Sequence, residues 1–154
     1  DHIPNVGTNI AMSMPDAESV AGVAAVPGRI HTMGGQANAP ADPEFGASKH
    51  VATTVLAMRS AAPQQRGALN LKTSDELLDA LTAAGLSTAE FEAGYEDRYR
   101  RLTDLLATTE PTPQVLYHEG AFGVEPITYV FGESAIDAVT TVVEAVSTTG
   151  DEPR

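Results

Sequence analysis

Apolar residues recur every three or four positions in four segments of the chain, which is the spacing of a helix with one buried face. The segments are Ser48 to Arg59, Ser74 to Ala84, Arg98 to Ala107 and Ser134 to Val146. The last has the clearest pattern, and its predicted buried stripe consists of Ile136, Val139, Val142, Val143 and Val146. Ser48 and Ser74 are placed to cap the first turns of their helices, and Gly85 is placed to end the second helix.

Shorter apolar runs before and between these segments are typical of strands. They are Val6 to Ser13, Val20 to Val26, Arg29 to Met33, Ala68 to Leu71, Val115 to Tyr117 and Ile127 to Phe131. Ser87 and Glu90 have the spacing of a capping box, yet Thr88 to Phe91 equally suits a strand, so the pattern leaves that segment open. Strands and helices intermix along the chain, which predicts an α/β fold with helices packed on the faces of a sheet.

The length of 154 residues suits one domain, which we place at residues 1–150, with a disordered tail at residues 151–154. No apolar run is long enough to span a membrane, and no signal peptide opens the chain, so we expect a cytoplasmic protein. The chain begins at Asp1 rather than at a methionine, and we expect it to be a fragment of a longer one. Cysteine is absent, which excludes disulfides, thiolate metal sites and cysteine nucleophiles.

The charge balance is strongly acidic, with 9 basic and 21 acidic residues and a formal net charge of −12. Such a surface repels phosphate backbones and anionic membranes, so this domain is not expected to grip DNA by itself. An acidic surface that is poor in lysine also suits a protein from a high-salt cytosol. An ordinary acidic cytosolic protein is the alternative.

Two glycine-containing segments resemble anion sites. Gly28 permits a tight turn that holds Arg29 at a strand edge, where a guanidinium can bind phosphate; a surface arginine after a turn is the alternative. Gly46 leads into a predicted helix whose first backbone N–H groups can bind an anion. There Ser48 adds a hydroxyl, and His50 can donate to a phosphate oxygen or shuttle a proton. A plain helix cap with a partly exposed histidine accounts for the same residues.

A third glycine-rich segment lies between two predicted strands. Gly120 and Gly123 would let a ligand approach the backbone, and Glu125 can bind an amine, a hydroxyl or Mg²⁺; a hairpin loop is the alternative. Asn9 and Asn70 are polar positions inside apolar strands, and they either satisfy the core or contact a ligand. The spacing matches neither a Walker loop nor a dinucleotide fingerprint. The histidines have no metal-ligand spacing, so no metal site is predicted from them.

Five segments in order along the chain carry a family resemblance. They are Pro4 to Ala11, Val23 to Ile30, Phe45 to Ala52, Arg66 to Leu71, and Pro113 to Tyr117 leading to Gly123 to Pro126 and Val130 to Gly132. Together they resemble the archaeal-type thiamine-phosphate synthase domain, the ThiN family, which is also found as the C-terminal domain of phosphomethylpyrimidine kinases. The resemblance covers nearly the whole chain. It implies a three-layer α/β/α fold around a mixed sheet, like that of the aldolase/epimerase group, and a homodimer.

Members of this family join hydroxymethylpyrimidine diphosphate to a thiazole phosphate, giving thiamine phosphate and pyrophosphate. The resemblance places the family's catalytic arginine and histidine at Arg29 and His50, with Gly46 and Ser48 holding phosphate. Fixed cations and N–H groups would stabilise the negative charge that grows on the leaving pyrophosphate. An active synthase would need Mg²⁺, whereas binding alone needs no cofactor. The candidate Mg²⁺ ligands are Glu125, Asp42 and Glu44.

The chain departs from the family pattern where cations are expected. The enzymes usually have Gly-Lys-Glu-Pro where this chain has Val124 in the lysine position, and the next strand usually offers an arginine where this chain has Thr128 and Tyr129. The segments Asn70 to Thr73 and Ala93 to Asp97 also differ from the enzymes. Losing a charge-assisted partner of a phosphate costs on the order of 1.5–3 kcal/mol, which can remove turnover while leaving binding.

These departures are similar to those of archaeal transcription regulators that carry this domain behind a helix-turn-helix and sense thiamine phosphate. Haloarchaeal versions, with an apolar residue in the lysine position, look especially similar. We therefore predict an effector-sensing domain that binds thiamine phosphate or its pyrimidine and thiazole phosphate precursors, with DNA contacted only by a separate domain. The retained Arg29 and His50 favour the alternative, an active synthase. A structural or assembly domain is the second alternative. The predicted ligand-binding residues are Asn9, Gly28, Arg29, Gly46, Ser48, His50, Asn70, Gly120, Gly123 and Glu125.

Overall fold

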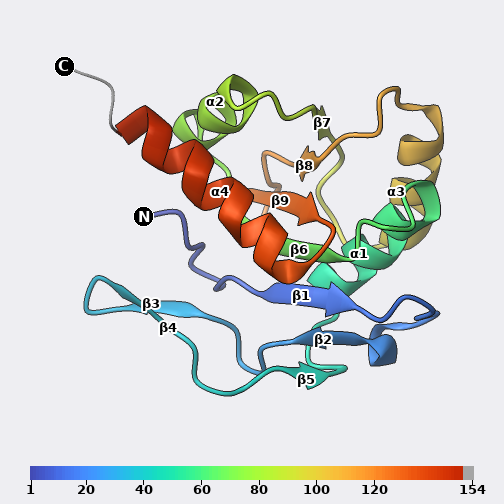
Figure 1. Ribbon diagram of the computed structural model, residues 1–154, viewed down its shortest axis with the longest axis horizontal. Coiled ribbons are helices and arrows are strands. Elements are labelled where there is room, and N and C mark those ends of the chain that lie inside the picture. The colour runs from blue at the N-terminus through green and yellow to red at the C-terminus, as the bar shows by residue number, and fades with distance from the viewer. Residues whose placement is uncertain (151–154) are drawn as a thin grey trace.

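Strands β6 (Gly67–Lys72) and β9 (Ile127–Gly132) are almost entirely buried, and they pair along their whole length at the centre of the molecule. Continuous apolar runs of this kind are typical of strands that are covered on both faces. They belong to a seven-stranded sheet in the order β5-β2-β1-β6-β9-β8-β7 (Figure 1). The other strands are β1 (Ile10–Ser13), β2 (Val23–Ala25), β5 (Glu44–Phe45), β7 (Thr88–Glu90) and β8 (Val115–Tyr117).

The protein is described by a computed structural model over residues 1–150. The tail at residues 151–154, predicted to be disordered, lies outside the described residues. Every neighbouring pair in the large sheet is antiparallel except β7 and β8, which are parallel, so the predicted mixed sheet is confirmed. A separate hairpin of β3 (His31–Met33) and β4 (Gln36–Asn38) extends away from one end of this sheet (Figure 1).

Within residues 1–150, four helices cover the two faces of the sheet, as the sequence predicted. Helices α1 (His50–Ala61) and α3 (Arg98–Thr108) pack on one face, where Ala68, Tyr129 and Phe131 share a core with them. Helices α2 (Asp75–Ala83) and α4 (Ala135–Gly150) pack on the other. Alternate residues of β6 and β9 point to opposite faces, so one pair of strands supplies both cores. None of the helices within residues 1–150 is long and apolar enough to cross a membrane.

Local signals decided several helix ends as expected. The Ser74 hydroxyl accepts the N–H of Leu77 at 3.1 Å and caps α2, and Gly85, with φ +88°, follows its end. The cap predicted at Ser48 differs, because α1 begins one residue later than that cap requires. Its capping residue is Lys49, whose side chain makes no capping bond, while Ser48 accepts the N–H of Ala52 at a long 3.4 Å.

The strand predictions were correct in position. In the N-terminal third of the chain, the predicted strands were longer than those observed. The strand expected over Val6 to Ser13 is confined to β1, because most of the residues before it form a loop. The run Val20 to Val26 divides into a short 3₁₀ turn, Val20–Gly22, and β2. The segment that the pattern left open is a strand, β7, which pairs with β8.

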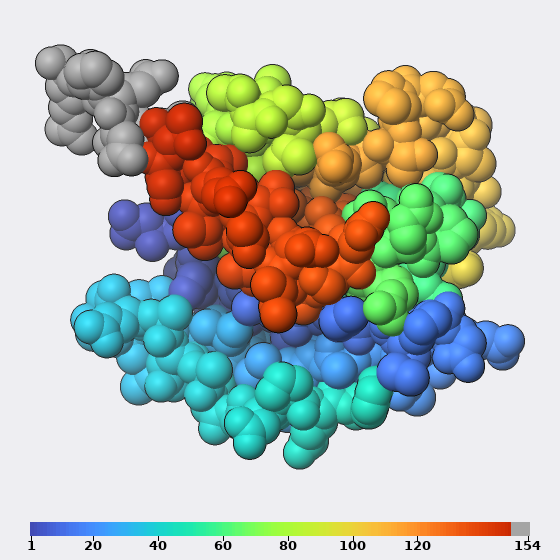
Figure 2. Space-filling view, viewed as in Figure 1, coloured from blue at the N-terminus to red at the C-terminus, as the bar shows by residue number. Residues whose placement is uncertain are grey.

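Helix α4 lies unusually close to the sheet because β6 and β9 present glycine beneath it. A Cβ on Gly67 would lie 2.1 Å from the carbonyl carbon of Ser134, and a Cβ on Gly132 would lie 2.6 Å from the backbone nitrogen of Ala138. Small residues on the helix suit this narrow gap, and Ala138 is completely buried there. Figure 2 shows α4 (red) lying across this face, between α2 (yellow-green) and the N-terminal strands (blue to cyan).

The close approach overturns part of the predicted stripe on α4. The buried line runs through Ala138, Val142 and Ala145, a spacing of four and then three residues. Ile136 and Val143, which were predicted to be buried, are 77% and 56% exposed. The error came from following only the large apolar residues. The contact line also contains small residues, and Ala138 lies directly above Gly132.

We predict that this corrected line determines which substitutions on α4 destabilise the fold. Val142→Ala should lower the free energy of unfolding by about 1–3 kcal/mol, because it removes two buried methyl groups and leaves a cavity. Ile136→Ala, a larger deletion, should change it by less than about 0.5 kcal/mol, because that side chain is already in solvent. Urea unfolding of the two variants measures both values. An equal loss of unfolding free energy in the two variants would show that Ile136 is buried, as the sequence pattern predicted.

Candidate functional site

A cavity of about 410 Å³ brings together five residues that the sequence singled out. They are Asn9, Arg29, Ser48, His50 and Asn70. The cavity opens between the loop before β1, the turn after β2, the start of α1 and the ends of β6 and β9. The remaining lining residues are Val6, Ala47, Lys49, Val51, Tyr95, Ile127 and Tyr129. Its size is that of a site for a small molecule.

Arg29 is held in an unusual backbone conformation. Its φ is +65°, directly after Gly28 at +76°, so two consecutive residues occupy the left-handed region. A non-glycine residue in that region costs about 1–3 kcal/mol and persists where the surrounding structure holds it, often at functional sites. One guanidinium nitrogen, Nη1, donates to the carbonyl of Val6 at 2.7 Å. That bond fixes the side chain against the cavity wall, and the planar fork has further N–H groups to offer a ligand.

His50 is the first residue of α1, and its ring stacks on Tyr95, with ring centroids 4.1 Å apart and an angle of 29° between the planes. The pKa of the His50 imidazole is lowered, first by burial and then by three nearby cations. These are Arg98, Arg29 and Lys49. The ring is therefore neutral at neutral pH, with one nitrogen that donates and one that accepts a proton.

The start of α1 adds a second source of positive potential to the cavity. Lys49, His50 and Val51 all line it, so the N-terminal end of α1, with its positive end of the helix dipole, lies at the cavity wall. The hydroxyl of Ser48, a buried residue, lies beside them. A chain with a net charge of −12 thus gathers two cationic side chains and a helix N-terminus around one cavity, which favours an anionic ligand.

Asn9 and Asn70 serve the fold as well as the cavity. The Asn9 side-chain carbonyl accepts the N–H of Val26 at 2.8 Å, and its amide group donates to the carbonyl of the same residue at 3.2 Å. Asn70 accepts the N–H of Asn9 at 2.6 Å and donates to the carbonyl of Gly7 at 3.0 Å. These bonds hold the loop before β1 and the strand that leads to Arg29. The interpretation that the two asparagines satisfy the core is confirmed, and contact with a ligand stays a prediction for two residues that also line the cavity.

Other predicted ligand residues lie away from the cavity wall. Glu125 is engaged in the fold, because its two carboxylate oxygens accept the N–H groups of Asn5 and Val6 at 2.9 and 3.1 Å. The carbonyl of Val6 in turn accepts a hydrogen bond from the Arg29 guanidinium, so Glu125 supports the arginine indirectly, through the backbone of Val6. Gly120 and Gly123 have positive φ in the loop between β8 and β9, where Ala121 and Val124 bridge in a tight turn. That loop matches the hairpin alternative.

Two more glycines act through the backbone rather than on the cavity wall. Gly28 supplies the left-handed turn that precedes Arg29, and Gly46, with φ +76°, lies between β5 and α1. Neither is among the described residues that line the cavity. They place the side chains that do line it.

The predicted Mg²⁺ ligands do not form a cluster. No group of three or more histidine, aspartate or glutamate side chains within residues 1–150 is arranged to hold a metal ion. Glu125 is bound to backbone N–H groups, and Asp42 and Glu44 are exposed near β5. The described residues therefore do not fit a protein-held Mg²⁺.

Three site residues were missed by the sequence analysis. Tyr95 stacks on His50, Tyr129 lines the cavity from β9, and Arg98, only 3% exposed, donates from Nη1 to the Tyr129 hydroxyl at 2.9 Å. Burial raises the pKa of Tyr129, so its hydroxyl stays protonated. One signal was available, because Arg98 precedes Leu102 and Leu106 at intervals of four residues and so lies on the buried side of its helix.

His118 is a second buried histidine, close to the site. It is 1% exposed, and its Nδ1 accepts the N–H of Gly120 at 3.1 Å, so this nitrogen carries no proton. Burial, aided by the charge of Arg98, lowers its pKa to about 4 from 6.5. Between these two values the unfolded chain binds more protons than the folded one.

We predict that the free energy of unfolding falls as the pH drops from about 6.5 to 4, because His118 must be protonated on unfolding. His118→Gln removes the titrating group and should flatten this part of the stability curve. Urea unfolding at several pH values measures both slopes. The same slope in the two proteins would show that His118 does not titrate as described.

Comparison with known proteins decides the family. The sequence model of the family described as thiamine-phosphate synthase ThiN matches residues 1–144. The chain belongs to the ThiN family. It is 32% identical over 152 residues to the thiamine-phosphate synthase ThiN of Methanothermobacter thermautotrophicus, covering 92% of this chain and 80% of that protein. It is also 32% identical to the bifunctional thiamine biosynthesis protein ThiDN of Methanocaldococcus jannaschii, but spans only 35% of its length.

Solved structures agree with this assignment. The crystal structure of the C-terminal domain of a phosphomethylpyrimidine kinase superposes with a TM-score of 0.85 at 29% identity, covering 94% of this chain and 87% of that one. An aldolase II superfamily protein from Pseudomonas syringae gives a TM-score of 0.50 at 13% identity, covering 97% of this chain and 66% of that one. The second likeness concerns the fold alone, and it confirms the fold that the resemblance implied.

Proposed function

We propose that this ThiN domain makes thiamine phosphate, joining hydroxymethylpyrimidine diphosphate to a thiazole phosphate in the Arg29–His50 cavity. The observation that carries the proposal is the convergence of Arg29, Ser48 and His50 on one anion-favouring cavity. These positions come from two separate segments, Val23 to Ile30 and Phe45 to Ala52. They are positions that the family resemblance assigned to phosphate binding and catalysis. The named synthase relatives favour this activity over the sensing role that the sequence suggested.

The chemistry asks the cavity to stabilise a leaving group. The bond between the methylene carbon of the pyrimidine and a diphosphate oxygen breaks, that oxygen keeps the electron pair, and the thiazole nitrogen forms the new bond to carbon. Arg29 and the first N–H groups of α1 lie where they can bind the pyrophosphate as its charge grows. The neutral His50 can donate a hydrogen bond to the same group. Mg²⁺ enters only as the counter-ion that accompanies the diphosphate substrate.

The experiment is to supply both substrates with Mg²⁺ and to measure thiamine phosphate and pyrophosphate together. The proposal expects the two products in equal amounts. Pyrophosphate without thiamine phosphate would indicate simple hydrolysis of the diphosphate. If neither product formed, the synthase activity would be excluded. A variant at a histidine that does not line the cavity, His2→Ala, serves as the control for substitutions in the cavity.

A second candidate function, an effector-binding domain of a regulator, is favoured by one observation. Val124 stands where the family enzymes have lysine, and Tyr129 and Thr128 stand where they have arginine. This candidate uses the same cavity and leaves any DNA contact to a separate domain. It predicts that thiamine phosphate binds and that the two precursors release no pyrophosphate. Calorimetry with thiamine phosphate, run beside the product assay, distinguishes it from the synthase.

A further inference from the structure

Arg98 is a buried cation enclosed by aromatic rings. It is 3% exposed, and its guanidinium carbon lies 4.7 Å from the centre of the Tyr95 ring, 5.4 Å from that of Phe91 and 5.9 Å from that of Tyr129. Cation–π contacts of this kind hold the guanidinium in place. They do not replace a counter-ion, because ring faces carry only a quadrupole.

The hydrogen bonds of Arg98 are incomplete. Nε donates to the carbonyl of Gly94 at 3.1 Å, and Nη1 donates to the hydroxyl of Tyr129 at 2.9 Å. Both partners are neutral. Nη2 is buried and has no hydrogen-bond partner within the described part of the chain. A buried charge without an anionic partner and with an unused donor is costly, and an anionic ligand bound to that donor would reduce the cost.

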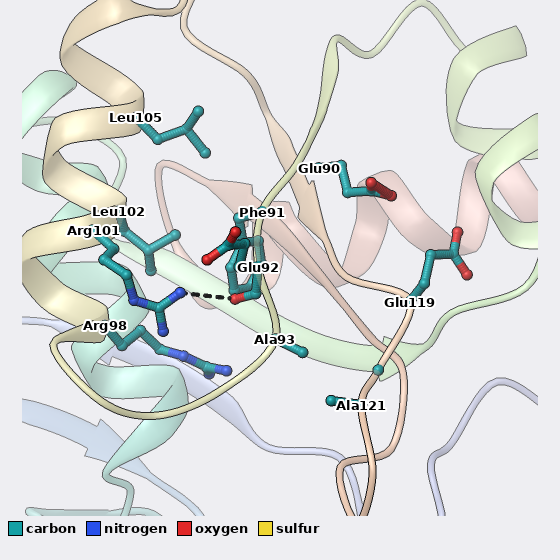
Figure 3. Close-up of a pocket in the computed structure, with 11 residues that line it drawn as sticks. Glu90, Phe91, Glu92, Ala93, Arg98, Arg101, Leu102, Leu105, Glu119 and Ala121 are labelled. Atoms are coloured by element: carbon teal, nitrogen blue, oxygen red, sulfur yellow. Dashed lines mark hydrogen bonds between the residues drawn. The ribbon is translucent and has the colours of Figure 1, made fainter.

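A cavity of about 650 Å³ lies against this side chain, between α3, the segment after β7 and the loop between β8 and β9. Figure 3 shows Arg98 reaching from α3 across the cavity, toward the segments that carry Ala93 and Ala121. Phe91, Leu102 and Leu105 supply an apolar wall. The cavity is distinct from the one that contains Arg29 and His50, although Tyr95 and Tyr129 contact Arg98 on one side and line that first cavity on the other.

In the second cavity, the positive charge is buried and the negative charges are exposed to solvent. Arg98 is buried at its inner wall, whereas Glu90, Glu92 and Glu119 are exposed around it. The other arginine of the lining, Arg101, is already bound to the chain, because it donates to the backbone carbonyls of residues 92, 94 and 96. Figure 3 shows the bond to Glu92. Among the described lining residues, one cation with an unused donor therefore remains, at the deep end of an apolar space.

We propose that this second cavity is a binding subsite for a small molecule with an oxyanion at one end and a flat apolar body. The oxyanion, a phosphate or a carboxylate, binds the guanidinium of Arg98, whose hydrogen bonds within the described residues are incomplete, and the body packs on Phe91 and Leu105. The exposed carboxylates around the mouth disfavour a second negative charge on the body. The proposal concerns a different cavity from the one assigned to synthesis, and it stands whether or not the chain is a synthase.

The test uses phenyl phosphate and benzoate as the two oxyanion probes and benzyl alcohol as the uncharged one. Calorimetry on the wild-type chain should show binding of at least one oxyanion and weaker binding of the alcohol. The probe that binds more tightly shows whether the subsite prefers a phosphate or a carboxylate. Arg98→Met, which keeps the length and apolar character of the side chain, should weaken that binding at least about tenfold, the loss expected for one charge-assisted hydrogen bond.

Matched variants distinguish binding at this subsite from binding elsewhere on the protein. Arg100→Met removes the same charge from the exposed side of α3 and should leave binding unchanged. Ala121→Leu reduces the space in the cavity while keeping the Arg98 side chain, and it should weaken binding to a similar degree, so the test survives if Arg98→Met fails to fold. Wild-type affinity in both Arg98→Met and Ala121→Leu would overturn the proposal. Loss of binding in Arg29→Met alone would place the probe in the first cavity and would overturn it too.

Discussion

Replacing His50 with alanine is expected to lower the rate of thiamine phosphate formation at least about 100-fold, while the chain stays folded. The size of this decrease in rate follows from the loss of a positioned group that assists the leaving pyrophosphate. The ring stacks on Tyr95 at the cavity wall rather than in the core, so its removal should leave the thermal midpoint nearly unchanged. Initial rates with both substrates, beside circular dichroism melting, measure the two effects.

Arg29→Met should have a comparable effect for a different reason. The substitution removes the guanidinium that faces the anion and also the bond to the Val6 carbonyl. Arg100→Met, which removes an exposed arginine elsewhere, is the control and should keep the wild-type rate. Rates within twofold of the wild type in both His50→Ala and Arg29→Met would show that catalysis does not occur in this cavity.

Gly67→Ala is expected to lower the free energy of unfolding by about 3 kcal/mol or more. Its new methyl group would lie 2.1 Å from the carbonyl carbon and 2.2 Å from the carbonyl oxygen of Ser134, so helix α4 would have to move off the sheet. Overpacking against backbone is among the few mechanisms that produce losses of this size. Urea unfolding measures the loss, with the far-ultraviolet spectrum showing whether the variant folds at all.

Gly46→Ala is the matched control for this prediction. A Cβ there would meet nothing within 4 Å, but the residue has φ +76°, so only the backbone conformation opposes alanine. The expected cost is about 1–2 kcal/mol. A Gly67→Ala variant no less stable than Gly46→Ala would mean that α4 does not approach the sheet as closely as described.

The site was predictable from sequence where neighbouring residues define it. The turn at Gly28 and Arg29 and the helix start at Ser48 and His50 are local features with local signals, and the structure brings them to one cavity. Glu125 was not predictable in the same way. Its partners, the N–H groups of Asn5 and Val6, lie about 120 positions away in the chain, so its supporting role depends on the tertiary fold.

The fold was predictable to the extent that large apolar residues mark the core. Strands β6 and β9 and helix α2 follow that rule. It failed on α4, where the close approach to glycines on two strands buries Ala138, Val142 and Ala145 and leaves Ile136 and Val143 exposed. It also passed over Arg98, since a charged residue is expected in solvent unless a partner is known. In both cases the decisive information is what lies opposite the residue.

The measurement that tests the Arg29–His50 cavity most directly is calorimetry with thiamine phosphate and with thiamine, on the wild-type chain and on Arg29→Met. Both candidate functions place the phosphate against Arg29. We predict that the wild-type chain binds thiamine phosphate at least about tenfold more tightly than thiamine, and that this preference largely disappears in Arg29→Met. Equal affinity of the wild-type chain for the two compounds, or an undiminished preference in Arg29→Met, would contradict the assignment of this cavity as the phosphate site.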